Sequence, residues 1–144
     1  MSQRVLNSQP IVIGCAGWSP GRDLVSTFPV EGTHLHRYAS RLNAVEINSS
    51  FYRPHSRQTY ARWADSMRDG FRFCVKVPKH ITHERCLQDC GRALGEFVGQ
   101  CSGLNDRLGC LLVQLPPSSA FDHSVSCTEY RSALLALYFS LSGA

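Results

Sequence analysis

The chain has 144 residues, of which 43% are hydrophobic and 18% are charged, and its formal net charge is +4. This length and composition fit one ordinary globular domain and exclude a disordered chain. The 15 basic residues are scattered rather than gathered in a block or a helical stripe, which disfavours a nucleic-acid partner, and no apolar run approaches the roughly 20 residues of a membrane span.

Apolar runs and helical stripes alternate along most of the chain. Four runs predict buried strands, at residues 11–18, 44–51, 71–77 and 108–115. Three segments between them place apolar side chains on one helical face, at residues 34–42, 58–67 and 90–104. Proline residues follow the third and fourth runs and end them, at Pro78 and Pro116. This alternation is typical of right-handed βαβ units, so the sequence predicts an α/β fold with a parallel sheet.

The two ends of the chain differ from this pattern. Residues 1–10 are polar and lack an apolar signal core, so we expect a polar N-terminal extension there. Residues 123–144 are apolar around 134–141, which favours a last helix, but nothing in them predicts a fifth strand. The predicted organisation is therefore an extension, a β/α region over residues 11–122 and a divergent C-terminal tail.

The seven cysteines are expected to be reduced thiols, as in a cytoplasmic protein. Their number is odd, and three of them lie inside apolar runs, where a thiol behaves as a small hydrophobic side chain: Cys15, Cys74 and Cys110. Cys86 and Cys90 stand near two histidines, but no Cys-x-x-Cys pair supports a zinc site. We therefore expect no metal and no other cofactor.

Polar residues interrupt the predicted strands near their carboxyl ends, where parallel α/β sheets bind ligands. Glu46 and Asn48 interrupt the second run, Lys76 lies near the end of the third, and Gln114 near the end of the fourth. Strand parity predicts that all four point to one side of the sheet, and that the valines between them point to the other. Asn48 and Gln114 would then orient a ligand by hydrogen bonds.

Glu46 and Lys76 have two interpretations that residue type alone leaves open. They form a structural ion pair between neighbouring strands, in which each charge satisfies the other. Alternatively they form a site, in which Glu46 is an acid or base and Lys76 stabilises charge or acts as a base.

The end of the first strand and the second helix each carry a tryptophan. Gly17 and Trp18 close the first strand, and Trp18 is either a core side chain or a stacking wall for a ligand. Trp63 lies on the apolar stripe of its helix, so we expect it to pack in the core.

The loops that follow the second and third strands add further candidates. Tyr52 and Arg53 follow the second strand, and Arg53 either binds a carboxylate or phosphate or is simply solvated. Thr82 and His83 follow the third strand. His83 is either a general acid or base held by Thr82, or a residue that caps the next helix.

Five sequence blocks together resemble the YecE-like family, the domain of unknown function numbered 72. The blocks are GCAGW at 14–18, YASRLNAVEINSSFYR at 38–53, RWADSM at 62–67, FRFCVKVPKHITHERCL at 71–87 and LGCLLVQLPPSSAFD at 108–122. The resemblance implies a TIM-type β/α barrel whose biochemical activity is uncharacterised.

Carried over by position, the motif residues of the family include every strand-end residue named above. They are Gly17, Trp18, Glu46, Asn48, Phe51, Tyr52, Arg53, Trp63, Lys76, Pro78, Thr82, His83, Gln114, Leu115, Pro116 and Pro117. This coincidence favours a site over an ion pair. The predicted catalytic residues are Glu46, Lys76 and His83, and the predicted ligand-binding residues are Gly17, Trp18, Asn48, Tyr52, Arg53, Thr82 and Gln114.

The resemblance also implies that only the first half of such a barrel, about four strands, is present. Family members continue for four more β/α units, whereas from His123 onward this chain no longer looks like the family, as in a truncated or frame-shifted form. Four strands leave two open sheet edges, through which copies of the chain would associate.

Three functions stay open at this point. The first is a TIM-barrel enzyme of unknown reaction, in which the predicted catalytic residues act on a small polar, anionic or sugar-like ligand. The second is a non-catalytic binding module for phosphate or nucleic acid. The third is an inactive truncated fragment, because a complete site would need residues from the second half of a barrel.

Overall fold

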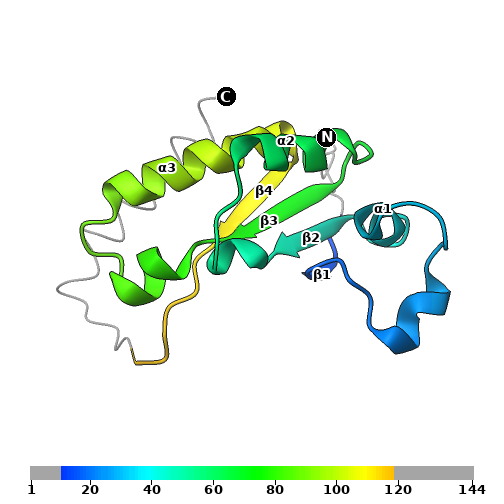
Figure 1. The fold of residues 1–144 in the computed structure, drawn as a ribbon, viewed down its shortest axis with the longest axis horizontal. Coiled ribbons are helices and arrows are strands. Elements are labelled where there is room, and N and C mark those ends of the chain that lie inside the picture. The colour runs from blue at the N-terminus through cyan, green and yellow to red at the C-terminus, as the bar shows by residue number, and fades with distance from the viewer. Residues whose placement is uncertain (1–10, 119–144) are drawn as a thin grey trace, which may run out of the picture.

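A computed structural model describes residues 11–118 of the chain, which form a single parallel sheet in the order β1-β2-β3-β4 with helices between the strands (Figure 1). The strands are β1 (Gly14–Ala16), β2 (Ala44–Ile47), β3 (Arg72–Lys76) and β4 (Leu108–Leu112). The helices are α1 (His34–Ala39), α2 (Arg57–Asp65) and α3 (Gly91–Cys101). Four short helical turns complete the fold: η1 (Arg22–Thr27), η2 (Ser49–Phe51), η3 (His80–Glu84) and η4 (Ser102–Arg107).

The predicted α/β fold is therefore confirmed. A parallel strand, a helix and the next parallel strand follow one another as in the β/α units of a TIM-type barrel, but these four strands form an open sheet. The predicted N-terminal extension and the predicted last helix lie outside the described residues. No helix in the part that the structure describes is long and apolar enough to cross a membrane.

Every strand is shorter than the apolar run that predicted it, and β2 is the case that matters for the site. It ends at Ile47, because Asn48 has helical backbone angles (φ −82°, ψ −23°) and leads into η2. Phe51 therefore lies in a helical turn and not in a strand. A short apolar run looks the same whether it ends as a strand or as a turn, so periodicity alone could not separate the two.

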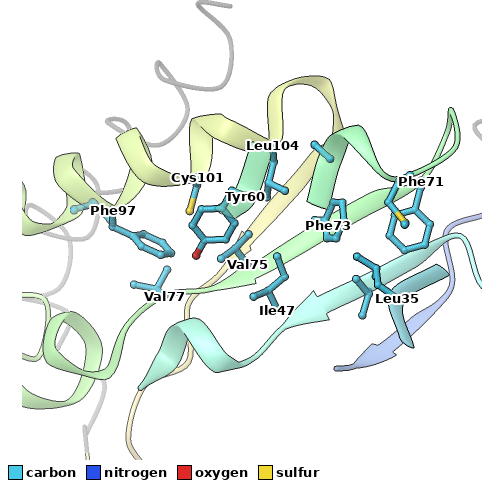
Figure 2. Packing of buried hydrophobic residues seen from close by; sticks show 14 of the residues in the cluster. Leu35, Ile47, Tyr60, Phe71, Phe73, Val75, Val77, Phe97, Cys101 and Leu104 are labelled. Atoms are coloured by element: carbon cyan, nitrogen blue, oxygen red, sulfur yellow. The ribbon is translucent and has the colours of Figure 1, made fainter. Parts of the chain in front are cut away.

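The core lies between the sheet and the helices α2 and α3, which lie on the same side of β3 and β4 (Figure 1). Alternate residues of β2 and β3 face these helices and are wholly or almost wholly buried: Val45, Ile47, Phe73 and Val75. Figure 2 shows Tyr60 of α2 and Phe97 of α3 packed above Val75 and Val77. Each such side chain contributes roughly 1.5–3 kcal/mol through burial, so this layer supplies most of the stability.

Local sequence explains where the helices begin and how closely they pack. The Thr33 and Ser56 hydroxyls accept hydrogen bonds from backbone N–H groups in the first turns of α1 and α2, as N-cap residues do. Gly103 lies against the start of α2, where a Cβ atom would come within 2.2 Å of the Arg57 carbonyl oxygen. Only glycine permits this approach between η4 and α2.

Strand β1 is held mainly by polar contacts and not by burial. The Asn43 side chain accepts from the Ile13 N–H at 2.8 Å and donates to the Ile11 carbonyl at 2.9 Å. The Tyr38 hydroxyl accepts from the Cys15 N–H at 2.7 Å and donates to the Ala44 carbonyl at 2.8 Å. All three residues of β1 are exposed to solvent.

Candidate functional site

The face of the sheet that α2 and α3 do not cover carries the polar strand residues. We call it the open face and define it by Ala16, Glu46, Cys74, Lys76, Cys110 and Leu112, which strand register and parity place on one side. All of these residues are partly or largely exposed. Glu46 and Lys76 lie on the same face and the intervening valines are buried, so the predicted parity is confirmed for these two residues.

Glu46 and Lys76 do not form the structural ion pair considered from the sequence. Among residues 11–118, none of the ion pairs involves either of them. Glu46 lies opposite Cys74, and Lys76 lies two residues further along β3, a distance of roughly 6.6 Å along the strand. This spacing separates the charges while keeping both on the open face.

Lys76 instead contacts an aromatic ring at the carboxyl end of the sheet. Its ammonium nitrogen lies 4.5 Å from the centre of the Phe51 ring, in a cation–π contact. The same ring packs edge-on against two others, with ring centres 5.0 Å apart for His83 and 5.1 Å apart for Tyr52. Phe51 thus holds together three side chains from two different strand-end loops and one strand.

His83 is oriented by its neighbour in η3. The Thr82 hydroxyl lies 2.8 Å from Nδ1 of His83 and 3.4 Å from the Pro78 carbonyl oxygen, and Thr82 itself is wholly buried. The next helix, α3, has Cys90 at its N-cap, so His83 is not the cap considered from the sequence. We name Phe51, Tyr52, Lys76, Thr82 and His83 the Phe51 cluster.

Ser50 fixes the position of this cluster, although the sequence analysis did not single it out as a site residue. It is wholly buried, and its hydroxyl lies 2.8 Å from the Ile47 carbonyl oxygen and 2.6 Å from the Lys76 carbonyl oxygen. The hydroxyl therefore ties η2 to the end of β3, which brings Phe51 over Lys76. In the sequence, the only indication of these roles was that Ser50 and Phe51 are adjacent, just after the second strand.

A second group of aromatic rings lies at the same end of the sheet, between β1 and α2. Gly17 has φ +80° and donates its N–H to the Glu46 carbonyl oxygen at 2.9 Å, which directs the chain into Trp18. The Trp18 ring packs edge-on against Trp63 at 5.0 Å, and Trp63 meets the His55 ring at 4.9 Å. Trp18 is half-buried and packs as part of the structure.

His55 links this group to the loop after β2. Its Nε2 lies 2.8 Å from the Ser49 hydroxyl. Burial lowers the pKa of His55 below its ordinary value, and the positive charge of Arg53 lowers this pKa further. Arg53 itself is exposed to solvent, in keeping with a position at the rim of any site.

The two remaining predicted ligand-binding residues are Asn48 and Gln114. Asn48 is half-buried at the end of β2, and its Oδ1 atom is buried without a hydrogen-bond partner among the described residues. Such an atom is free to accept a hydrogen bond from a ligand or a water. Gln114 is exposed two residues beyond β4, while Val113 and Leu115 on either side of it pack against the core.

Five cysteines within the described residues are free thiols, and Cys127 lies outside these residues: the free thiols are Cys15, Cys74, Cys86, Cys101 and Cys110. Cys86 is exposed and Cys90 is buried. No group of three or more His, Cys, Asp or Glu side chains among residues 11–118 is placed to hold a metal ion.

Comparison with known proteins gives one family. The model of DUF72, described as a protein of unknown function, matches residues 12–137 and so extends past residue 122, where the sequence blocks end. The YecE protein of Escherichia coli K12, labelled UPF0759, is 37% identical over 84 residues. That match covers 58% of this chain and 31% of the relative, and the YecE protein of E. coli O157:H7 gives the same values.

Solved structures show the same fold. Two crystal structures of a DUF72 family protein from Enterococcus faecalis V583 superpose on this chain with TM-scores of 0.58 and 0.64, at 21% sequence identity. Each superposition covers 88% of this chain and 46% of the solved chain. The chain therefore spans less than half of the solved relative and under a third of the YecE proteins.

Proposed function

The chain belongs to the DUF72 family, and we propose that the carboxyl end of its sheet binds a small anionic or polar ligand and carries out acid/base chemistry on it. One observation carries the proposal: Lys76 and His83 lie against the same Phe51 ring, with Glu46 nearby on the open face. Such chemistry needs a cation, an imidazole and a carboxylate, and here the carboxylate joins no ion pair among residues 11–118.

The proposed roles follow from the contacts of each group. Lys76 neutralises the charge of the ligand, since its ammonium group touches an aromatic ring and no carboxylate within the described residues. When the Thr82 hydroxyl donates to the Pro78 carbonyl, its oxygen accepts from Nδ1–H of His83, which leaves Nε2 of His83 as the basic nitrogen. Glu46 is the second acid or base.

Three other residues complete the proposed site. The unpaired Oδ1 of Asn48 accepts a hydrogen bond from the ligand, as a buried polar atom without a partner favours. Tyr52, with 72% of its surface exposed, and Arg53 border the entrance after β2. We infer a cytoplasmic protein from the thiols that stay reduced at Cys15, Cys86 and Cys110, which are exposed.

The experiment uses the fact that Lys76 and Lys79 are the two lysines of the chain. Methylation of both with a ¹³C label gives one NMR signal for each, and inorganic phosphate and simple carboxylates serve as probes. We expect the Lys76 signal to move and the Lys79 signal to stay, because Lys79 is exposed and paired with Glu84 at 3.5 Å. Equal shifts of both signals, or none, would contradict the proposal.

A non-catalytic binding module is the second candidate, and the exposed Arg53 at the rim favours it. A module that holds phosphate or a nucleic-acid end by charge alone loses affinity steeply as salt rises. A site that also uses Asn48 and His83 retains more of its affinity, and phosphate titrations at two salt concentrations separate the two. An inactive fragment would show neither behaviour.

We also propose that the β1 edge joins a second copy of the chain. Ile11, Val12 and Ile13 lead into this edge with 80%, 51% and 60% of their surfaces exposed, and an apolar strand edge readily adds another strand. Light scattering of the full chain should give a dimer, and Ile13→Lys should give a monomer. The control is Val30→Lys, at an exposed site outside the sheet. A monomeric unchanged chain would contradict this proposal.

A further inference from the structure

Two cysteines face each other on the open face, beside the proposed site but outside its chemistry. Cys74 of β3 and Cys110 of β4 are Cα partners in the register of the two strands. Neighbouring strands lie about 4.8 Å apart, and disulfides form between Cα atoms roughly 4.4–6.8 Å apart. The backbone therefore already holds this pair within reach of a covalent bond.

An irregularity in the sheet creates this pairing. The register passes from Phe73 opposite Leu108 to Cys74 opposite Cys110, so Gly109 is an extra residue that has no partner of its own. In a regular ladder Cys110 would lie opposite Val75 and face the core. The bulge at Gly109 turns Cys110 onto the open face instead.

The surroundings of the two thiols differ. Cys110 is exposed, whereas Cys74 is half-buried between Cys110 and Glu46 in one row across the sheet. Burial, then the neighbouring Cys110 thiol and the Glu46 carboxylate, raises the pKa of Cys74 to about 12. Cys110 is therefore the thiol that is accessible to reagents in solution. Cys74 is the less accessible thiol beside it.

We propose that Cys74 and Cys110 form a reversible redox pair, which low-molecular-weight disulfides of the glutathione class oxidise to an intramolecular disulfide. The Cys110 thiolate attacks one sulfur of the small disulfide and releases one small thiolate. The Cys74 thiolate then attacks the Cys110 sulfur and releases the second. Two protein thiols are oxidised, one small disulfide is reduced to two thiols, and the two protons from the protein pass to the released thiolates.

Oxidation would change the proposed site without touching its catalytic groups. The disulfide joins β3 to β4 directly beside Glu46 and two residues before Lys76. It would fix the spacing of the strands that carry these groups, and it would remove the thiol next to the Glu46 carboxylate. Excess small thiol restores the reduced pair, as for other exposed disulfides.

The test begins with the unchanged full chain in oxidised glutathione, followed by a count of free thiols and peptide mapping of the non-reduced protein. We expect the count of free thiols to fall by two and the map to contain one peptide that joins Cys74 to Cys110. Disulfides between other cysteines, or Cys110 left as a stable mixed disulfide with glutathione, would overturn the proposal. The same oxidation in denaturant should give a mixture of pairings.

Two variants separate the steps and one provides the control. Cys74→Ser should trap glutathione on Cys110, because the second thiol is missing. Glu46→Gln should speed closure of the disulfide, since loss of the carboxylate charge favours the Cys74 thiolate. Cys86→Ser removes an exposed thiol elsewhere and should leave the Cys74–Cys110 peptide unchanged. The proposal would be contradicted if the Cys74–Cys110 peptide disappeared in Cys86→Ser, or if Glu46→Gln slowed formation of the disulfide.

Discussion

The two faces of the sheet are made by alternate residues of the same strands, yet they differ in almost every property. On the face toward α2 and α3, Val45 and Phe73 are 1% and 0% exposed and belong to one continuous core. On the open face, their chain neighbours Glu46 and Cys74 are partly exposed and take part in no ion pair or disulfide among the described residues. One face therefore supplies the stability of the sheet, and the other face is free to carry reactive groups.

The largest expected effect is the loss of a core ring from the covered face. Phe73→Ala should lower the free energy of unfolding by about 3–5 kcal/mol, because a wholly buried aromatic side chain leaves a cavity. Cys74→Ala, at the next residue on the open face, is the matched control and should cost under ~1 kcal/mol. Urea unfolding measures both, and equal losses would remove the distinction between the faces.

The second prediction concerns Ser50, which lies at the carboxyl end of the sheet between its covered face and its open face. Ser50→Ala removes a buried hydroxyl that serves two carbonyl oxygens, so we expect a loss of roughly 1–3 kcal/mol in unfolding free energy. The Lys76 NMR signal should also shift, because η2 would no longer hold Phe51 over it. Ser49→Ala is the exposed control and should leave the Lys76 signal in place.

A smaller effect is expected at the contact between Lys76 and Phe51. Phe51→Leu keeps an apolar side chain but removes the ring face, so the cation–π contact of about 0.5–1 kcal/mol is lost. We expect little change in unfolding and a clear weakening of phosphate binding, because Lys76 and His83 would no longer share a fixed support. If phosphate binding is unchanged in Phe51→Leu, the Phe51 ring does not support the binding site.

The sequence predicted the covered face better than the site, for a physical reason. The burial of Val45 and Val75, and the placement of Glu46 and Lys76 opposite to them, follow from period-two alternation, which any half-buried strand must show. Alternation could not decide whether Glu46 and Lys76 form an ion pair, because the distance between the two charges depends on the register of the strands. No residue type reveals register.

Other features of the site depended on local backbone geometry that periodicity does not encode. Phe51 is the centre of its cluster because β2 ends at Ile47, four residues before the end of the apolar run. Cys110 meets Cys74 because of one extra residue, Gly109, and a bulge has no clear signature in a Gly-containing apolar run. The family motif listed Phe51 but gave it no role.

The smallest expected effect concerns pH and the His55 ring, which lies between the loop after β2 and the aromatic residues of α2. Burial, and after it the charge of Arg53, lowers the pKa of His55 below the 6.5 of an unfolded chain, so the unfolded state takes up a proton first as pH falls. His55 therefore reduces stability as pH drops below about 6.5, until the folded state is protonated as well.

In urea titrations near pH 7 and pH 5, His55→Gln should lose less stability on acidification than the unchanged chain. Arg53→Gln should recover only part of this difference, since burial is the larger cause. If Arg53→Gln and His55→Gln had equal effects, charge and not burial would set the pKa of His55, and the aromatic packing at this end of the sheet would matter less than its geometry indicates.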